Sequence, residues 1–314
     1  MIVTLTPNPS LDRTATVPEL RRGEVLRASR VRLDPGGKGV NVARALTAAG
    51  TPTVALLPAG GTVGERLADL LAPEGVPVVA VPIAGTIRSN ITLVEADGTT
   101  TKINEPGPEI LPAELVALER RAVELAGRAE WLVCCGSLPA GVPDDFYARL
   151  TRLAHDAGAK VAVDTSGAPL AAACAGGPDL LKPNLDELTE LARRPLPLLG
   201  DVVAFCRELI SGGVGSVLVS LGARGAVLVD AVETRHGVGP LVAVRSTVGA
   251  GDAALAGFLH AGGAGPRALR TAVAYGTAAV AQEGSRMPTP QDVHSEAVRL
   301  LAADPTVNLS GAAA

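Results

Sequence analysis

Short runs rich in β-branched residues alternate along this chain with longer stretches of helical periodicity, and this alternation limits the possible folds more than any other feature of the sequence. It is typical of βαβ units, in which a helix connects two parallel strands. We therefore predict an α/β fold with a largely parallel central sheet. The expected core strands are residues 2–6, 53–57, 131–135, 160–164, 216–220 and 226–229.

The helical stretches between these strands have recognisable ends. Several begin with Pro or an acidic residue and end at Gly, because Pro fits the first turn of a helix and Gly accepts the left-handed conformation that follows the last turn. The expected helices are residues 39–49, 64–71, 112–126, 143–157, 186–192, 201–211, 251–261, 266–282 and 290–302.

Two stretches interrupt the alternation, residues 12–33 and 87–105, and both have the composition of extended chain. Within the second, Asp97-Gly98 separates two β-rich runs, which predicts a hairpin. A sheet of this size is marginally stable alone. We therefore expect a lid that packs over the main domain, or a pairing with a second subunit in a homodimer. The terminal residues 304–314 have no periodicity, and we expect a frayed tail.

Length, charge and composition restrict the possible partners. A chain of 314 residues can bury enough surface for one large α/β domain or for two smaller domains. The net charge of −4 and an aromatic content of 2% argue against nucleic acid, whose binding relies on cations and stacking rings. No segment approaches the roughly 18 apolar residues of a membrane span. The four cysteines form no CxxC pair, which disfavours zinc, and we expect a reducing, cytoplasmic location.

The segment Ser246-Thr-Val-Gly-Ala-Gly-Asp252, followed by a helical run, is the most informative motif. Its glycines expose backbone N–H groups at the positive end of a helix, which is a site suited to a phosphate. Asp252 in the first turn is then either a helix cap or a base that takes a proton from an incoming hydroxyl.

Four further segments each have two interpretations. The turn Asp34-Pro-Gly-Gly-Lys-Gly-Val-Asn41 either holds a phosphorylated ligand or is a glycine turn with a solvated lysine. The glycines of residues 219–227 either admit a nucleotide or merely form a turn. Residues 182–187, Lys-Pro-Asn-Leu-Asp-Glu, either orient Mg²⁺ through water or form a capping box. Polar lid residues, including Glu105, are by themselves best interpreted as a solvated face. A GxGxxG fingerprint after the first strand is missing, which disfavours a dehydrogenase.

The order of these motifs is more specific than any one of them. Asn8-Pro-Ser-Leu-Asp12, Gly36-Gly-Lys-Gly-Val-Asn41, Gly136-Ser-Leu-Pro139, Lys182-Pro-Asn184 with Glu187, Ser220-Leu-Gly222 with Gly225, and Val248-Gly-Ala-Gly-Asp252 follow one another along the chain. This series closely resembles the PfkB (ribokinase-like) carbohydrate kinase family over residues 1–303. Within the family, Thr101-Lys-Ile-Asn-Glu105 and the Gly-Gly-Lys-Gly turn are most similar to 1-phosphofructokinases and tagatose-6-phosphate kinases.

The resemblance implies a three-layer α/β/α domain with a small β-sheet lid, and it implies roles for matching residues. Asp252 matches the catalytic base, and Gly249, Ala250 and Gly251 match the anion hole. On the nucleotide side, the matching residues are Lys182, Asn184, Ser220, Gly222, Ala223 and Gly225, with Glu187 at Mg²⁺ through water. On the sugar-phosphate side they are Asp12, Gly37, Lys38, Asn41, Arg88, Asn90, Lys102 and Ser137. Among these, Arg88 and Lys38 are expected to hold the phosphate that the substrate already carries, because cations bind a dianion well.

The activity implied is transfer of the γ-phosphate of MgATP to the 6-hydroxyl of fructose 1-phosphate, which gives fructose 1,6-bisphosphate. Phosphorylation of tagatose 6-phosphate or fructose 6-phosphate at the 1-hydroxyl is the alternative within the class. A catalytically inactive sugar-phosphate sensor on the same fold is the alternative outside it. The sequence departs from the family at Ala253, where Ser or Thr is usual, and at Ile87-Arg88, where Thr-Arg is common. Activity is expected to survive both.

Overall fold

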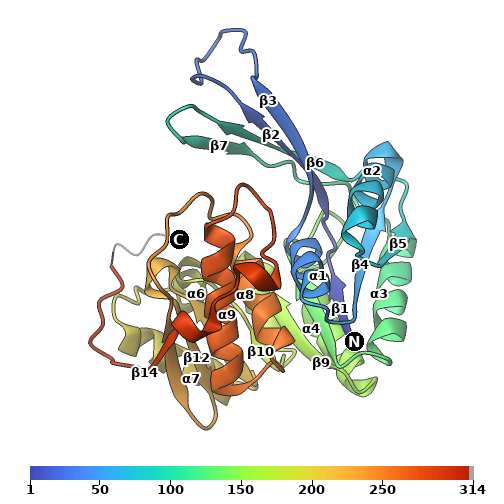
Figure 1. Cartoon of the computed structure of the whole chain (residues 1–314). Coiled ribbons are helices and arrows are strands. Elements are labelled where there is room, and N and C mark those ends of the chain that lie inside the picture. The colour runs from blue at the N-terminus through green and yellow to red at the C-terminus, as the bar shows by residue number, and fades with distance from the viewer. Residues whose placement is uncertain (311–314) are drawn as a thin grey trace.

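The computed structural model describes residues 1–310, and a ten-stranded sheet forms its centre. Seven neighbouring strands are parallel, and three antiparallel strands complete one edge (Figure 1). From edge to edge the order is β5 (Val78–Pro82), β4 (Thr53–Ala59), β1 (Ile2–Leu5), β8 (Trp131–Cys135), β9 (Lys160–Asp164), β10 (Leu180–Leu181), β11 (Ser216–Ser220), β12 (Ala226–Asp230), β13 (Thr234–Val238) and β14 (Arg299–Ala302).

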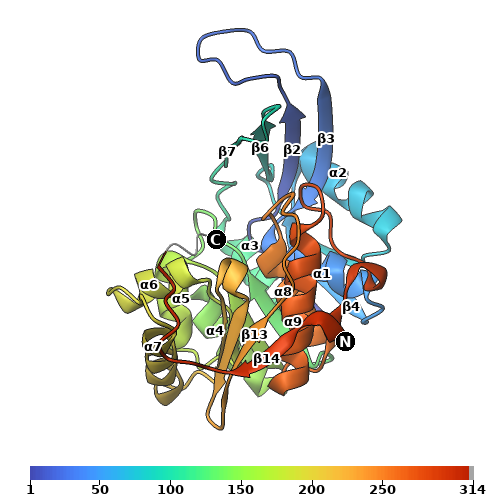
Figure 2. The ribbon, with the colours of Figure 1, turned by 60° about the vertical axis from the view of Figure 1, so that its left-hand side comes forward.

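Helices cover both faces of this sheet, so the predicted three-layer architecture is confirmed (Figure 2). One face carries α1 (Lys38–Ala48), α8 (Ala250–His260) and α9 (Gly265–Val280). The other carries α3 (Pro112–Ala126), α4 (Phe146–Asp156), α5 (Gly167–Cys174), α6 (Leu185–Ala192) and α7 (Leu199–Ser211), while α2 (Gly61–Leu71) packs beside β4 and the base of the lid. Within residues 1–310, no helix has the length and apolar character needed to cross a bilayer.

The two interrupting stretches form a separate four-stranded sheet, as predicted, which projects from the main domain (Figure 1). Its order is β3 (Arg30–Gly36), β2 (Ser10–Thr16), β6 (Arg88–Val94) and β7 (Thr100–Ile103). The hairpin at Asp97-Gly98 joins β6 to β7, with Val94 opposite Thr100. We call this sheet the lid.

Some sequence-based expectations were wrong. Residues 290–302 are not a helix: two short 3₁₀ turns lead into β14, which pairs with β13. At the start of this segment, Pro290 and Asp292 form a capped 3₁₀ turn in place of the first turn of a helix. After that turn, strand pairing overrides the helical periodicity of the sequence. Residues 304–310 are not frayed, because Leu309 is buried and its N–H donates to the Pro197 carbonyl at 2.7 Å. The rest of that tail, 311–314, lies outside the described residues. The elements α5, β5, β10 and β13 were not predicted.

The parallel strands direct their carboxyl ends to one edge of the sheet, and polar residues cluster there. Asp164 ends β9, Lys182 follows β10, and Ser220 ends β11. The carboxyl edge of a parallel sheet is where α/β proteins bind ligands. In this chain the lid stands over that edge.

Candidate active site

A cavity of about 670 Å³ lies between the carboxyl edge of the sheet, the start of α8 and the lid. Every site residue predicted from the sequence lines it except Ser137. The Ser137 hydroxyl instead accepts a hydrogen bond from Asn8 Nδ2 at 3.3 Å. Five of the six motif segments, all except residues 136–139, thus line one cavity.

Asp252 lies in the first turn of α8, directly after a tight turn at Gly249 with φ of 77°. Its side chain is almost fully buried, and Oδ2 accepts a hydrogen bond from Asn41 Nδ2 at 2.9 Å. Burial, with the negative charge of Asp164, raises the pKa of Asp252 from 3.8 to about 6, although Lys38, Asn41 and Lys182 oppose the rise. A carboxylate with this pKa can accept a proton near neutral pH.

The Asn41 amide is itself held by a buried network that sequence reasoning missed. Arg44, one turn further along α1, forms a bidentate pair with Glu74 at 2.7 and 2.8 Å. Its Nη1 donates to Asn41 Oδ1 at 3.4 Å and to the Ser285 carbonyl at 3.1 Å. Since Asn41 Oδ1 accepts from arginine, its Nδ2 is directed at Asp252. Arg44 and Glu74 therefore position the candidate base through Asn41.

A second missed residue, Asp164, organises the cations of the site. Its carboxylate is fully buried and contacts two ammonium groups: Lys38 Nζ at 2.7 Å and Lys182 Nζ at 3.0 Å. Burial alone would raise the pKa of Asp164, but these two charges hold it below its usual value. Burial would likewise lower the pKa of Lys38, but Asp164, Glu187 and Asp252 raise it above its usual range. The signal was available in the sequence, because Asp164 is a carboxylate at the end of a predicted parallel strand.

The segment 182–187 forms the capping box that the spacing allowed. The backbone N–H of Glu187 donates to Asn184 Oδ1 at 2.8 Å, and that of Asn184 donates to Glu187 Oε2 at 2.9 Å. Glu187 Oε1 also lies 3.3 Å from Lys38 Nζ. Within residues 1–310, no group of three or more His, Cys, Asp or Glu side chains could hold a metal by itself. The donor set therefore fits an ion such as Mg²⁺ only where substrate oxygens and water supply most ligands, with one carboxylate nearby.

The other end of the cavity is apolar and has no aromatic ring in its lining among the described residues. Leu241 is 98% exposed and Val244 is 65% exposed, although both are aliphatic and line the cavity. Nearby, Gly225 has φ of 83°, and a Cβ there would collide with the Gly237 carbonyl. An apolar slot beside a glycine turn suits a flat heterocycle.

Lid residues contribute polar groups that contact one another and do not form a merely solvated face. Asp12 Oδ1 accepts hydrogen bonds from Ser10 Oγ at 2.7 Å and from Asn90 Nδ2 at 3.0 Å. Arg88 donates through Nη1 to the Glu105 carbonyl and through Nη2 to the Asn8 carbonyl, each at 3.0 Å. Both cations expected at the substrate phosphate, Arg88 and Lys38, thus have protein partners.

A buried carboxylate at a glycine-rich helix start, near two ammonium groups and a polar lid, is typical of small-molecule kinases on an α/β/α fold. The profile of the pfkB family of carbohydrate kinases matches residues 8–292. The chain therefore belongs to the pfkB family, and the resemblance in the sequence is confirmed.

Named relatives cover nearly the whole chain. It is 38% identical to a 1-phosphofructokinase of Rhodobacter capsulatus, over 92% of this chain and 93% of that protein. It is also 38% identical to ATP-dependent 6-phosphofructokinase isozyme 2 of Escherichia coli (strain K12), over 93% of this chain and 96% of that protein. The crystal structure of phosphofructokinase-2 from Escherichia coli in complex with potassium matches with a TM-score of 0.87 at 37% identity, covering 93% and 96% of the two chains.

The departure from the family at Ala253 has a structural context. Ala253 is fully buried in the core cluster beneath α8, whereas its neighbours Asp252 and Ala254 line the cavity. Its methyl group packs with apolar residues and leaves the candidate base and the glycine turn intact.

Proposed function

We propose that this protein is an ATP-dependent sugar-phosphate kinase that converts fructose 1-phosphate to fructose 1,6-bisphosphate. The similarity to a named 1-phosphofructokinase supports this substrate. The observation that carries the reaction type is the buried Asp252, hydrogen-bonded by Asn41 and placed directly after the backbone N–H groups of a glycine-rich helix start. A purely sugar-binding sensor has no need for a carboxylate held in this environment.

In the proposed reaction, Asp12, Asn41 and Asn90 bind sugar hydroxyls, with Gly37 and Ser137 alongside. Asp252 takes the proton from the 6-hydroxyl of the sugar while the hydroxyl oxygen forms a bond to the γ-phosphorus. The bond between the γ-phosphorus and the bridging oxygen breaks, and that oxygen leaves with ADP. The N–H groups of residues 249–251 would stabilise charge on the transferring phosphoryl group, where fixed dipoles act most strongly. Positioning and electrostatics of this kind supply most of the catalysis in phosphoryl transfer.

ATP would lie with its base in the apolar slot of Leu241 and Val244 and its phosphates toward the sheet edge. The turn of Ser220, Gly222, Ala223 and Gly225 would hold the nucleotide, and Lys182 and Asn184 would contact its phosphates. Glu187 would hold Mg²⁺ through water. When bound, the ion neutralises phosphate charge during transfer.

Fructose 6-phosphate is the second candidate substrate, phosphorylated at its 1-hydroxyl. The specific observation in its favour is that a relative named as a 6-phosphofructokinase is as similar to this chain as the 1-phosphofructokinase. Both reactions need the same base and the same anion hole, so the substrate must be tested directly.

An ADP-release assay with fructose 1-phosphate, fructose 6-phosphate, tagatose 6-phosphate and ribose tests the proposal. We expect the highest kcat/KM with fructose 1-phosphate. A preference for fructose 6-phosphate would replace the named substrate and leave the reaction type intact. Absence of phosphorylation with all four, while ATP and sugar phosphate still bind, would favour the sensor instead.

We also propose that the lid forms a homodimer. Strand register places Leu33, Arg13, Ile91 and Ile103 in one row across the lid, on the face opposite Asp12. Leu33 is 36% exposed and Ile103 is 53% exposed, so aliphatic side chains at both ends of this row are uncovered. Light scattering should give a molar mass twice the 31.6 kDa of one chain. The Ile103→Glu variant should have the mass of a single chain. A wild-type monomer would refute this pairing.

The cytoplasmic location remains a prediction.

A further inference from the structure

The connection from β11 to β12, residues 220–225, lines the larger cavity beside its apolar end, and we call it the nucleotide turn. Gly222 and Ala223 are exposed and offer at most a methyl group for packing. Within the turn, the Leu221 N–H donates to the Gly225 carbonyl at 2.8 Å, and the Gly225 N–H donates to the Gly222 carbonyl at 3.0 Å. Side-chain packing at the tip therefore contributes little to holding the turn in place.

A buried histidine on a neighbouring strand holds the turn from outside. His236 lies in β13, and only 5% of it is exposed. Its Nε2 lies 2.7 Å from the carbonyl oxygen of Arg224. Because a carbonyl oxygen can only accept, Nε2 must carry the proton and donate it. His236 has no role in the function proposed above.

The alternation of side chains along β13 explains why the ring reaches the turn. Gly237, the next residue, faces α9, where a Cβ would lie 3.0 Å from Val273 Cγ2. Since successive side chains of a strand point to opposite faces, His236 points away from α9. Strand register places His236 opposite Val227, just beyond Gly225 at the end of the turn. The ring is therefore adjacent to the turn.

The histidine fixes one peptide group of the nucleotide turn. The Arg224 carbonyl and the Gly225 N–H belong to the same planar peptide and point in opposite directions. The carbonyl accepts from His236, and the N–H donates to the Gly222 carbonyl, so this peptide is held on both sides. Gly225 has φ of 83°, and glycine has many other conformations available, so it needs such contacts to stay in this one.

We propose that His236 is a positioning residue for ATP binding. Its Nε2–H holds the Arg224 carbonyl and so keeps the nucleotide turn in the conformation that accepts the ligand. This rests on the proposed ATP-dependent function. The imidazole does not line the cavity, so it acts through the backbone. Its loss lowers the fraction of the protein that is ready to bind, which raises the apparent Kd for ATP by the inverse of that fraction.

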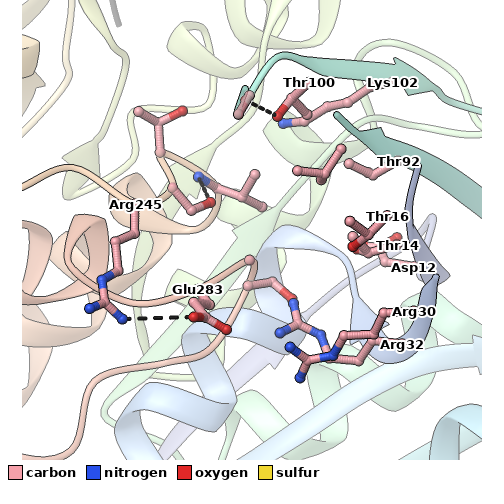
Figure 3. Close-up of a pocket in the computed structure, with 17 residues that line it drawn as sticks. Asp12, Thr14, Thr16, Arg30, Arg32, Thr92, Thr100, Lys102, Arg245 and Glu283 are labelled. Carbon is pink, nitrogen blue, oxygen red and sulfur yellow. Dashed lines mark hydrogen bonds and ion pairs between the residues drawn. The ribbon is translucent and has the colours of Figure 1, made fainter. Parts of the chain in front are cut away.

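The sugar side of the site does not depend on this contact. A smaller cavity of about 500 Å³ lies under the lid, between its strands and residues 245–248 and 283–285 (Figure 3). Asp12 and Lys102, both predicted on the sugar side, line it, and among the described residues none of the nucleotide turn does. A change at His236 should therefore act on ATP and leave the KM for the sugar phosphate near its wild-type value.

Steady-state kinetics of three variants test the proposal. His236→Leu removes the donor at similar volume, and the amide of His236→Asn ends one bond short of the Nε2 position. For both we expect the KM for ATP to rise about 5- to 50-fold, since losing one hydrogen bond shifts an equilibrium by about this factor. The kcat value and the KM for the sugar phosphate should stay within about twofold. His236→Gln, whose amide nitrogen is as many bonds from Cα as Nε2, should recover most of the loss.

A second histidine provides the matched control. His155 Nε2 lies 2.9 Å from Asp179 Oδ2, outside the cavity, so His155→Leu should leave the KM for ATP unchanged. An unchanged KM for ATP in His236→Leu and His236→Asn would overturn the proposal, even with a lower Tm, because the contact would then serve folding alone. Equal losses in the Asn and Gln variants would also overturn it. These two differ by one methylene, so their comparison decides even where His236→Leu does not fold.

Titration calorimetry with MgATP, without sugar, separates this proposal from the proposed function. Binding that weakens in His236→Leu and His236→Asn, in a wild-type protein that transfers no phosphate to any sugar tested, supports the positioning role and refutes the kinase. Equal binding by all variants refutes the positioning role and leaves the kinase intact. A wild-type protein that binds no MgATP refutes both.

Discussion

Replacing the candidate base with its neutral isostere should make the protein more stable while it destroys activity. Asp252 has a pKa of about 6, against 3.8 for an ordinary aspartate, because it is buried near Asp164. At roughly 1.36 kcal/mol per pH unit, this difference means that ionised Asp252 costs the folded state about 3 kcal/mol. Asn has the shape of the protonated acid and does not incur that cost.

The sign of this effect depends on pH. Below about pH 4, the carboxyl is protonated in both the folded and the unfolded chain, so Asp252→Asn should change stability little. Between pH 4 and 6 the unfolded chain ionises first, and the folded wild type loses stability relative to the variant. Above pH 7 the full difference of about 3 kcal/mol is present, which corresponds to a Tm about 4–5 °C higher for a chain of this length.

Thermal unfolding at pH 4 and at pH 8 measures this difference, and the ADP-release assay measures the loss of turnover, expected to be several orders of magnitude. Asp144→Asn, at an exposed position, is the control and should change Tm little at either pH. A variant Tm at pH 8 equal to or below that of the wild type would refute the argument that burial disfavours the charge. Near-normal turnover would refute the role of Asp252 as the base.

Three further predictions concern the same helix start. Wild-type kcat/KM should fall about tenfold per pH unit below about pH 6, as Asp252 gains its proton; a flat acid limb would contradict this pKa. Asn41→Leu removes a hydrogen bond that favours the ionised form, so the midpoint of the acid limb should rise by about one to two pH units, and an unmoved midpoint would exclude the contact. Gly249→Ala should lower turnover at least tenfold and Tm by a few degrees, because its φ is 77° and its Cβ would lie 2.6 Å from Met287 Cε. Gly262→Ala is its control, with φ of 105° and open space, and equal losses in both would reduce the Gly249 effect to backbone strain.

Much of the main domain follows from local patterns. Strands 131–135 and 160–164 lie where predicted because continuous apolar runs between turns are typical of buried parallel strands. The lid hairpin follows from Asp97-Gly98, where Gly98 adopts φ of 91°. The helix expected at residues 290–302 was wrong because a capping pattern specifies only one turn. Pairing with β13, distant in sequence, decides the rest.

The candidate site divides in the same way. Asp252, Asn41 and the glycine turns could be predicted from the sequence. Each lies in a motif at a junction between elements, and the order of these motifs along the chain is specific. Sequence could not show that Arg44 and Glu74 position Asn41, or that Asp164 holds Lys38 and Lys182, because Arg44 and Glu74 are 30 positions apart and Lys38 and Asp164 are 126 positions apart.

The sequence by itself determined the α/β alternation, the lid segments, the family and about half of the residues that line the cavity, because these depend on local periodicity and on residue types at strand ends. Only the tertiary structure decided which charges are already paired and which face open space. Arg88 and Lys38 contact protein partners, whereas strand register places Arg32 and Lys102 at opposite ends of one row across the lid. The availability of a charge depends on its three-dimensional neighbours, and no linear pattern contains them.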